Sequence, residues 1–472
     1  MRAVLFVMVW VMCLPACTFL APSYQRPDSP IPEAWPVGPA YPSEGCGDSD
    51  VADIGWRDFI RDIPLQTLVE MALAHNRDLR VAALTIEQSR AALGVARSAQ
   101  FPTLNAVGSG TATKTAVDLT PKDTPRLTHT YAAGLAVSSY ELDFFGRLQN
   151  LKGQALENYL ASKAARDAAQ ITLVAEVATA YLTLLADQAR LDLAQKTLHS
   201  QKRSYALTQQ RFKFGIASQL DLSQIESSVH AAQSDVADNT RQLAQDYNAL
   251  TLLVGTAIPP KLLAHVKGAT SLQKPLKDIS AGISSRVLLR RPDIQAAEHT
   301  LKADYANIGA ARAAFFPSIT LTAGVGAGSR ELAHLFKGGH GTWSFMPQIN
   351  IPIFTGGYLT AQLDAAKATR DIDLAQYEKA IQTAFRETAD ALAARGTVRR
   401  QLKAQQALVR AAKQAYDVSY ALYRQSQSGY LEVLVAQRTR YQAEQGLIST
   451  KLAAVTSLVT LYKVLGGGVQ AE

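Results

Sequence analysis

The sequence has few of the residues on which catalytic and metal sites depend. It contains three cysteines, eight histidines and five methionines in 472 residues. The histidines are scattered, and none forms the His-x-x-x-His pair typical of a metal site on a helix. Gly324, Gly326 and Gly328 alternate like a phosphate loop, but no helix with a Lys-Ser/Thr pair follows them. We therefore expect no catalytic residues, no metal site and no enzyme activity.

Charge is also sparse and evenly spread. Charged residues make up 19% of the chain, and the lysines and arginines that give the net charge of +8 are spread along the sequence without a basic cluster. A nucleic-acid surface needs a basic patch interleaved with aromatic residues, so we expect no nucleic acid partner. Acidic residues on helical stretches are interpreted as solvated faces or as helix-stabilising pairs.

Proline and glycine are nearly missing from two long stretches. Residues 144–211 contain no proline, and Gly215 is the only glycine in residues 154–254. At about 1.5 Å per residue, residues 144–211 are expected to form a helix of roughly 100 Å. A returning helix after Gly215 has apolar residues at steps of three and four, which is typical of a coiled-coil seam. Residues 358–426 and 430–465 repeat the plan.

The N-terminus predicts export and lipidation. Residues 1–16 form a signal peptide whose apolar core is too short to span a bilayer. The following Cys17 completes a Leu-Pro-Ala-Cys sequence that resembles a bacterial lipobox, in which the cysteine carries a covalent lipid. Thr18 after it favours the outer membrane by resemblance to sorted lipoproteins. The alternative is an ordinary signal peptide. Cleavage would leave Cys46 as the only cysteine, which excludes an intramolecular disulfide.

A proline-rich arm, residues 17–52, follows and is expected to be extended, because it has seven prolines between positions 22 and 42. Residues 65–100 then have a helical, alanine-rich pattern, which Phe101 and Pro102 end.

Beyond these helices the hydrophobic period changes to two. Ile319, Leu321 and Val325 alternate with small or polar residues, and the returning run has Trp343 and Phe345. Such alternation predicts a sheet with different solvents on its two faces. We expect strands at about 103–113, 130–141, 318–327 and 343–353. Each is about ten residues long, enough to cross a bilayer at a tilt.

The chain is a tandem duplication. Residues 93–104 match residues 308–319 at an offset of 215, and later matches such as Gly146 with Gly357 hold an offset of 211. Internal repeats of this kind decide the fold class. The expected organisation is a first repeat at 53–255, a linker at 256–283, a second repeat at 284–466 and a tail at 467–472.

Four membrane strands cannot form a closed barrel, since about eight is the smallest number that can. An open edge in lipid leaves backbone groups without partners, so the strands must close by association. Three chains would supply twelve strands, together with the long helices. The predicted fold is mixed α and membrane β: a trimer with a 12-stranded membrane barrel and the long helices gathered below it. The alternative is a soluble hairpin on a coiled-coil stalk.

Several motifs resemble those of outer-membrane factors of the TolC/OprM type, in particular the lipoprotein efflux branch. They are residues 17–27, 53–56, 76–79, 140–147, 290–294, 309–317 and 376–381. The resemblance covers nearly the whole chain. It implies a homotrimeric conduit whose 12-stranded outer-membrane β-barrel continues into a periplasmic α-helical barrel. This conduit would dock on a periplasmic adaptor and an inner-membrane pump, with outer-membrane lipid around its barrel. Ser426 departs from the family pattern, which has a glycine at the second helix turn.

Two classes of function follow. The first is a passive export channel for drugs or other small molecules, with metal ions or secreted polypeptide as further cargo classes. The second is a structural lipoprotein that spans the envelope without conducting. Copper export often uses methionine ligands, and the mature chain keeps only Met71 and Met346, so the sequence gives that cargo no support.

The resemblance and the helix pattern name three sites. Cys17 is the expected lipid attachment site, and no other cofactor is expected. The adaptor is expected to dock on the two helix turns, formed by Phe214, Gly215, Ile216, Ala217, Ser218, Ser426, Gln427, Ser428 and Gly429. A periplasmic gate is expected at Asp417, Tyr420 and Arg424, which share one helical face. The alternative is that these three residues solvate the outside of the α-barrel.

Overall fold

The structure is a computed structural model that describes residues 20–41, 54–263, 275–279, 284–425 and 427–467. It divides into two compact units. Unit 1 comprises Met1–Asp28, Thr85–Ser162 and Ala296–Tyr377, and unit 2 comprises Ser29–Leu84, Lys163–Gln295 and Glu378–Glu472. Each unit therefore takes segments from both repeats. The repeats are not separate domains, because their long helices pass from one unit into the other.

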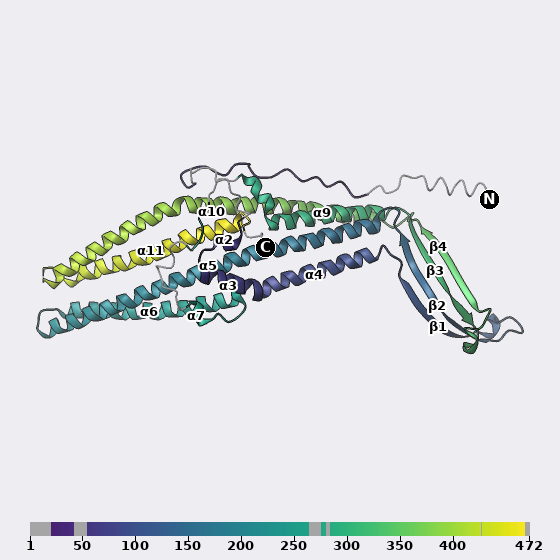
Figure 1. Ribbon diagram of the computed structural model, residues 1–472, viewed down its shortest axis with the longest axis horizontal. Coiled ribbons are helices and arrows are strands. Elements are labelled where there is room, and N and C mark those ends of the chain that lie inside the picture. The colour runs from purple at the N-terminus through teal and green to yellow at the C-terminus, as the bar shows by residue number, and fades with distance from the viewer. Residues whose placement is uncertain (1–19, 42–53, 264–274, 280–283, 426, 468–472) are drawn as a thin grey trace. The chain divides into compact units, whose positions relative to one another are not determined.

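Unit 1 contains a four-stranded antiparallel sheet in the order β1-β2-β3-β4 (Figure 1). The strands are β1 (Leu104–Lys114), β2 (Leu127–Leu142), β3 (Ser318–Ser329) and β4 (Gly341–Asn350). β4 ends before the expected residue 353, because its partner β3 begins only at Ser318, opposite Asn350. Pro352 also has no N–H with which to continue the pairing.

Each hairpin lies between helices. α4 (Arg77–Ser98) leads into β1, and α9 (Pro292–Ala313) leads into β3. After each hairpin comes a helix of 67 residues, α5 (Arg147–Lys213) or α10 (Tyr358–Arg424). The returning helices are α6 (Gln219–Val254) and α11 (Tyr430–Val464).

The sequence showed one uninterrupted helical pattern over residues 65–100. The structure has two helices there, α3 (Ile63–His75) and α4. The break is at Asn76, whose backbone is extended at φ −62° and ψ 134°. Its side-chain Oδ1 accepts a hydrogen bond from the Leu79 N–H at 2.9 Å and so caps α4. Asparagine is a favoured N-cap because its side chain replaces a missing backbone acceptor.

The largest hydrophobic core lies in unit 2, where α5, α6 and α11 pack with α3 and α2 (Trp56–Phe59). Phe59 stacks on Tyr462 with ring centroids 4.0 Å apart. Residues from the expected linker join this unit, since Ile60 pairs with Leu276 and the short helix α7 (Pro260–Leu263) follows α6.

Candidate functional site: the sheet, the helix turns and their supports

One face of the sheet is apolar across all four strands. Residues that pair directly in an antiparallel sheet point to the same face. The register therefore brings together the residues that alternate as apolar in the sequence: Leu104, Ala106, Leu135, Val137, Ile319, Leu321, Ala323, Val325, Trp343, Phe345 and Ile349. Trp343 is 81% exposed and Phe345 60% exposed. This confirms the predicted apolar face, which no described part of the chain covers.

The other face is lined by small and polar side chains. It carries Asn105, Ser109, Thr111, Thr113, Thr320, Thr342, Ser344, Gln348 and Asn350, with Val107 and Met346 as apolar exceptions. Gly134 and Gly326 lie opposite each other here. A Cβ on Gly326 would lie 2.3 Å from the Ala133 carbonyl oxygen, so β2 and β3 approach too closely for any side chain.

A β-bulge in β2 places the apolar side chains on both sides of the bulge on the same face of the sheet as those of β3. The register shifts between Val137 and Tyr140, and Ser139 has a positive φ of 52°. Its N–H donates to Thr322 Oγ1 at 3.2 Å. The extra residue turns Tyr140 to the apolar face, a correction that the sequence pattern did not reveal.

The first helix turn, residues 214–218, is built around Gly215 at φ +71°. The Ile216 N–H donates to the Arg211 carbonyl at 2.8 Å, which closes the end of α5 as in a Schellman motif. Ser218 then starts α6 through a capping box with Asp221. The turn exposes apolar side chains, since Phe214 is 80% and Ile216 64% exposed.

The second turn keeps the closing hydrogen bond of the first. The Gln427 N–H donates to the Leu422 carbonyl at 2.9 Å, the equivalent bond at an offset of 211. Ser426 itself lies outside the described residues. Gly429 precedes α11 without a side-chain cap, and Gln427 and Gly429 are exposed. This turn therefore presents polar groups where the first presents Phe214 and Ile216.

The three expected gate residues differ in their surroundings. Asp417 and Arg424 are exposed, whereas Tyr420 is partly buried and stacks on Tyr416 at 5.8 Å. The stacked pair packs against a hydrophobic cluster of Ile225, Tyr423, Tyr430, Val433 and Leu434.

Tyr423, which was not among the expected site residues, connects the two helical hairpins of unit 2. Its hydroxyl lies 3.3 Å from Thr208 Oγ1, and its carbonyl accepts from Arg211 Nη1 at 3.3 Å. The Arg211 guanidinium also lies 4.7 Å from the centre of the tyrosine ring. The sequence signal was the aromatic pair Phe212 and Tyr423, which occupy matching positions in the two repeats.

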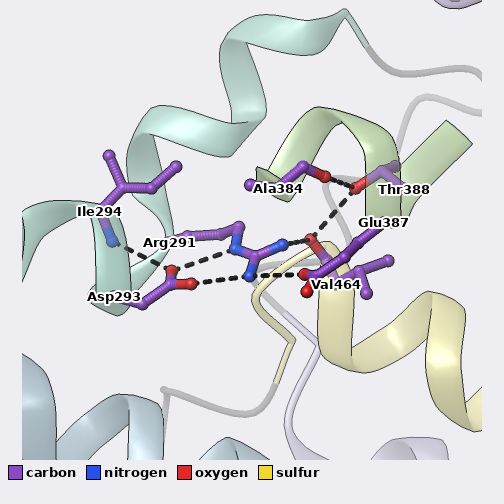
Figure 2. A network of polar contacts seen from close by, with 7 residues as sticks. All are labelled: Arg291, Asp293, Ile294, Ala384, Glu387, Thr388 and Val464. Atoms are coloured by element: carbon purple, nitrogen blue, oxygen red, sulfur yellow. Dashed lines mark hydrogen bonds and ion pairs between the residues drawn. The ribbon is translucent and has the colours of Figure 1, made fainter. Parts of the chain in front are cut away.

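A buried arginine joins the start of α9 to the end of α11 (Figure 2). Arg291 Nε and Nη2 donate to the two Asp293 oxygens at 3.0 and 2.7 Å, and Nη2 lies 3.2 Å from Glu387. Nη1 donates to the Val464 carbonyl at 3.0 Å. Burial opposes its charge, but the hydrogen bonds and charges of Asp293 and Glu387 outweigh burial and raise the pKa of Arg291.

The first repeat makes the same junction with a neutral residue. Asn76 occupies the position of Arg291, and its Nδ2 donates to the Leu253 carbonyl at 2.8 Å. Leu253 and Val464 correspond at the offset of 211. Residues 76–79 and 290–294, which belong to the motifs identified in the sequence, are thus structural connections at the end of each returning helix.

The proline-rich arm is held on α9 in unit 1. Arg26 Nη2 lies 2.6 Å from Glu298 Oε2, and the Tyr24 hydroxyl donates to Glu298 Oε1 at 3.2 Å. Arg312 Nη1 donates to the Leu20 carbonyl at 3.0 Å. Burial raises the pKa of Glu298, but hydrogen bonds from Arg26 and Lys302 outweigh it and leave the pKa lowered. Cys17 and Cys46 lie outside the described residues.

Within the described part of the chain, no group of three or more His, Cys, Asp or Glu side chains could hold a metal ion. By length and composition alone, α5 and α11 could cross a membrane, and 61% and 39% of their apolar windows are buried in the protein. Their apolar residues, among them Leu182, Leu185 and Tyr462, belong to the core of unit 2.

Comparison with known proteins gives consistent matches over nearly the full length. A family model described as outer membrane efflux protein matches residues 68–256 and again residues 283–467, in agreement with the duplication. The chain is 47% identical over 467 residues to the toluene efflux pump outer membrane protein TtgC of Pseudomonas putida, covering 99% of this chain and 96% of the relative. Outer membrane protein OprJ of Pseudomonas aeruginosa is 42% identical over 459 residues, with 97% and 94% covered.

Among solved structures, the open state of the Neisseria gonorrhoeae MtrE outer membrane channel is similar with a TM-score of 0.85 at 37% identity. The match covers 95% of this chain and 98% of that one.

Proposed function

This chain belongs to the outer membrane efflux protein family, and we propose from that premise that it is the outer-membrane channel of a tripartite efflux pump. It passively exports drugs or other small molecules that a periplasmic adaptor and an inner-membrane pump deliver to it. The proposal includes no catalytic step and no cofactor other than the lipid on Cys17.

The observation that carries this proposal is the sheet. Its apolar face suits lipid and its polar face suits a water-filled lumen. β1 and β4 each pair on one side only, so both edges need partners in a membrane. Three copies supply twelve strands and close a barrel wider than the eight-stranded ones that side chains fill.

Planar-bilayer recording tests the channel. Purified, cross-linked trimers should give stable unitary currents, and heat-denatured protein from the same preparation is the control. A structural lipoprotein without a lumen gives no current even when the trimer is intact. That result would replace the channel with the alternative function.

Cargo is tested in cells. Deletion of the gene should sensitise them to several unrelated drugs and solvents, and the wild-type chain should restore resistance. Co-purification then identifies the adaptor and pump. Sensitisation to metal ions alone, or loss of one secreted polypeptide alone, would instead assign the alternative cargo classes.

For adaptor docking we propose the two helix turns. The exposed Phe214 and Ile216 offer an apolar contact, and the second turn offers the exposed Gln427 and Gly429, with the Ser428 hydroxyl buried between them. Phe214→Asp should strongly reduce cross-linking to the co-purified adaptor. Phe336→Asp is the matched control, because Phe336 is similarly exposed at 84% in the β3–β4 loop. Equal cross-linking of both variants would remove the first turn from the interface.

For the gate we propose Asp417, Tyr420 and Arg424. Asp417 and Arg424 are seven residues apart, about 10.5 Å along the helix, so they cannot pair within one chain. Between neighbouring chains of a trimer they can form a charged ring, with Tyr420 as bulk. Charge reversal of Asp417 with Tyr420→Ala should raise resting conductance. Unchanged conductance in intact trimers would leave these residues as an outer solvated face.

Lipidation of Cys17 is proposed from the lipobox resemblance and from the docked arm. Leu20 is held by Arg312, close to where α9 ends and β3 begins. Three residues reach at most about 11 Å, so a lipid on Cys17 would start close to the sheet. Mass spectrometry of the mature N-terminus tests this, and an unmodified amine at any other residue would refute it.

A further inference from the structure

Two aspartates in unit 1 meet without a hydrogen-bond donor between them. Asp304 on α9 is 7% exposed, and its Oδ2 is buried without a donor among the described residues. Its neighbour is the carboxyl of Asp373 on α10. An ionised carboxylate only accepts hydrogen bonds, so two carboxyls in contact need a shared proton.

Charged groups on α9, on α10 and on the segments that contact α9 have other partners. Arg26 of the arm and Lys302 of α9 bind Glu298, Arg370 of α10 binds Asp371, and Glu157 of α5 binds His299. Tyr377, one turn from Asp373, has a buried hydroxyl without a partner in the described structure. Burial, followed by the hydrogen bond and charge of Asp373, raises the pKa of Asp304 to about 7.

A second pair has the same arrangement in unit 2. Asp187 on α5 forms an ion pair with Arg190, which also donates to Ser449 Oγ of α11 at 2.9 Å. Asp246 on α6 accepts from Gln242 at 3.0 Å through Oδ1, while its Oδ2 is buried without a donor in the described chain. Burial, and then the hydrogen bond that the protonated Asp246 donates to the Asp187 carboxylate, raise the pKa of Asp246 to about 6. Arg190 thus neutralises one aspartate, and the other carries the proton.

The duplication gives a neutral residue at the position of each of these carboxyls in the other repeat. At the repeat offsets, Asp304 and Asp373 correspond to Ser89 and Ser162. Asp187 and Asp246 correspond to Val398 and Ser457. The other repeat therefore supplies a neutral replacement for each carboxyl that can be tested in this one.

We propose that Asp304–Asp373 and Asp187–Asp246 are proton-shared clasps that tighten the α9–α10 and α5–α6 contacts in acid and release them as the medium becomes alkaline. For a carboxyl whose pKa is raised by folding, the stabilisation is complete below the unfolded pKa. It is lost as the pH rises through the folded pKa. The window therefore runs from the ordinary aspartate range up to about pH 6 for Asp246 and about pH 7 for Asp304.

Infrared spectroscopy of the full-length trimer tests the shared proton. At pH 5.5 the wild type should show a protonated-carboxyl band that disappears as the pH rises. Asp304→Ser combined with Asp246→Ser, which copies the other repeat, should remove it. Asp371→Ser is the control, because Asp371 is exposed on the same helix as Asp373 and should leave the band unchanged. The absence of a difference between the double variant and the wild type would overturn the proposal.

Thermal unfolding tests the clasp. The wild-type midpoint should fall from pH 5.5 to pH 8 by several degrees more than that of the double variant. The variant should be the more stable protein at pH 8. Equal slopes in the two proteins would refute a clasp even if the band is present. If the double variant does not fold, Asp373→Ser alone provides the same comparison for the first pair.

Discussion

Replacing Arg291 by alanine should destabilise unit 2 more than any single surface ion pair does. The change removes a guanidinium whose side chain is 10% exposed and which contacts Asp293, Glu387 and Val464. The loss has three parts with different weights, set by how well water can replace each contact.

The carboxylates recover most of their hydration, because Asp293 and Glu387 are 46% and 38% exposed. The Val464 carbonyl keeps, among the described residues outside its own helix, the Thr388 hydroxyl at 3.4 Å. An unsatisfied buried acceptor costs about 1–3 kcal/mol, and hydrogen bonds to charged groups contribute about 1.5–3 kcal/mol. Because the two carboxylates are partly rehydrated, we expect the free energy of unfolding to fall by roughly 2–3 kcal/mol in total. For a unit of this size we expect the unfolding midpoint to fall by roughly 4–6 °C.

Circular dichroism of purified trimers at a fixed scan rate measures the shift, since large proteins often unfold irreversibly. Arg286→Ala is the matched control, because its ion pair with Glu33 is exposed on both sides and should contribute under about 1 kcal/mol. The unfolding midpoint of Arg291→Lys should lie between those of Arg291→Ala and the wild type, because lysine keeps the charge but loses the bidentate geometry. If Arg291→Ala unfolds at the same temperature as Arg286→Ala, the junction in Figure 2 does not stabilise the fold.

Three further results are expected. Gly326→Ala should sharply reduce the yield of folded trimer, because its Cβ meets backbone at 2.3 Å, whereas Gly328→Ala, whose nearest atom is 3.7 Å away, should not. Trp343→Lys should lower membrane insertion by up to about 2–4 kcal/mol if its face contacts lipid, and Thr342→Lys on the other face should not; equal insertion of both would contradict the assignment of the faces. Because the pKa of Glu298 is lowered, its ionised carboxylate holds the arm at any pH above the ordinary glutamate pKa and releases it only in stronger acid. Limited proteolysis at pH 5 should therefore release the arm in Glu298→Gln but not in the wild type.

The faces of the strands could be predicted from the sequence because side chains alternate strictly along a strand, and Trp343 or Ile319 signals its face by composition alone. The first turn was equally visible, because only glycine adopts the φ of Gly215 without strain. Lipidation, docking and the gate stay predictions, since Cys17 and Ser426 lie outside the described residues and no partner chain is present.

Other features depend on partners distant in the chain. Asn76 lies in a helical pattern; its cap on Leu79 is local, but its hydrogen bond to Leu253 joins residues far apart in the chain. Asp304 and Asp246 were interpreted as members of solvated faces, because composition does not show which acidic residue is covered by another helix. Tyr423 likewise gains its connecting role only when Arg211 reaches it from α5.

The unpaired edges of β1 and β4 predict how mutant alleles behave when they are expressed together with the wild type. In the proposed trimer each copy completes the edge of its neighbours, so one chain that cannot pair leaves a ring with a gap. When such chains make up half of those synthesised, only about one eighth of randomly assembled trimers are whole. A pairing-defective allele should therefore be dominant over the wild type. A null allele, which adds no chains to the pool, should be recessive.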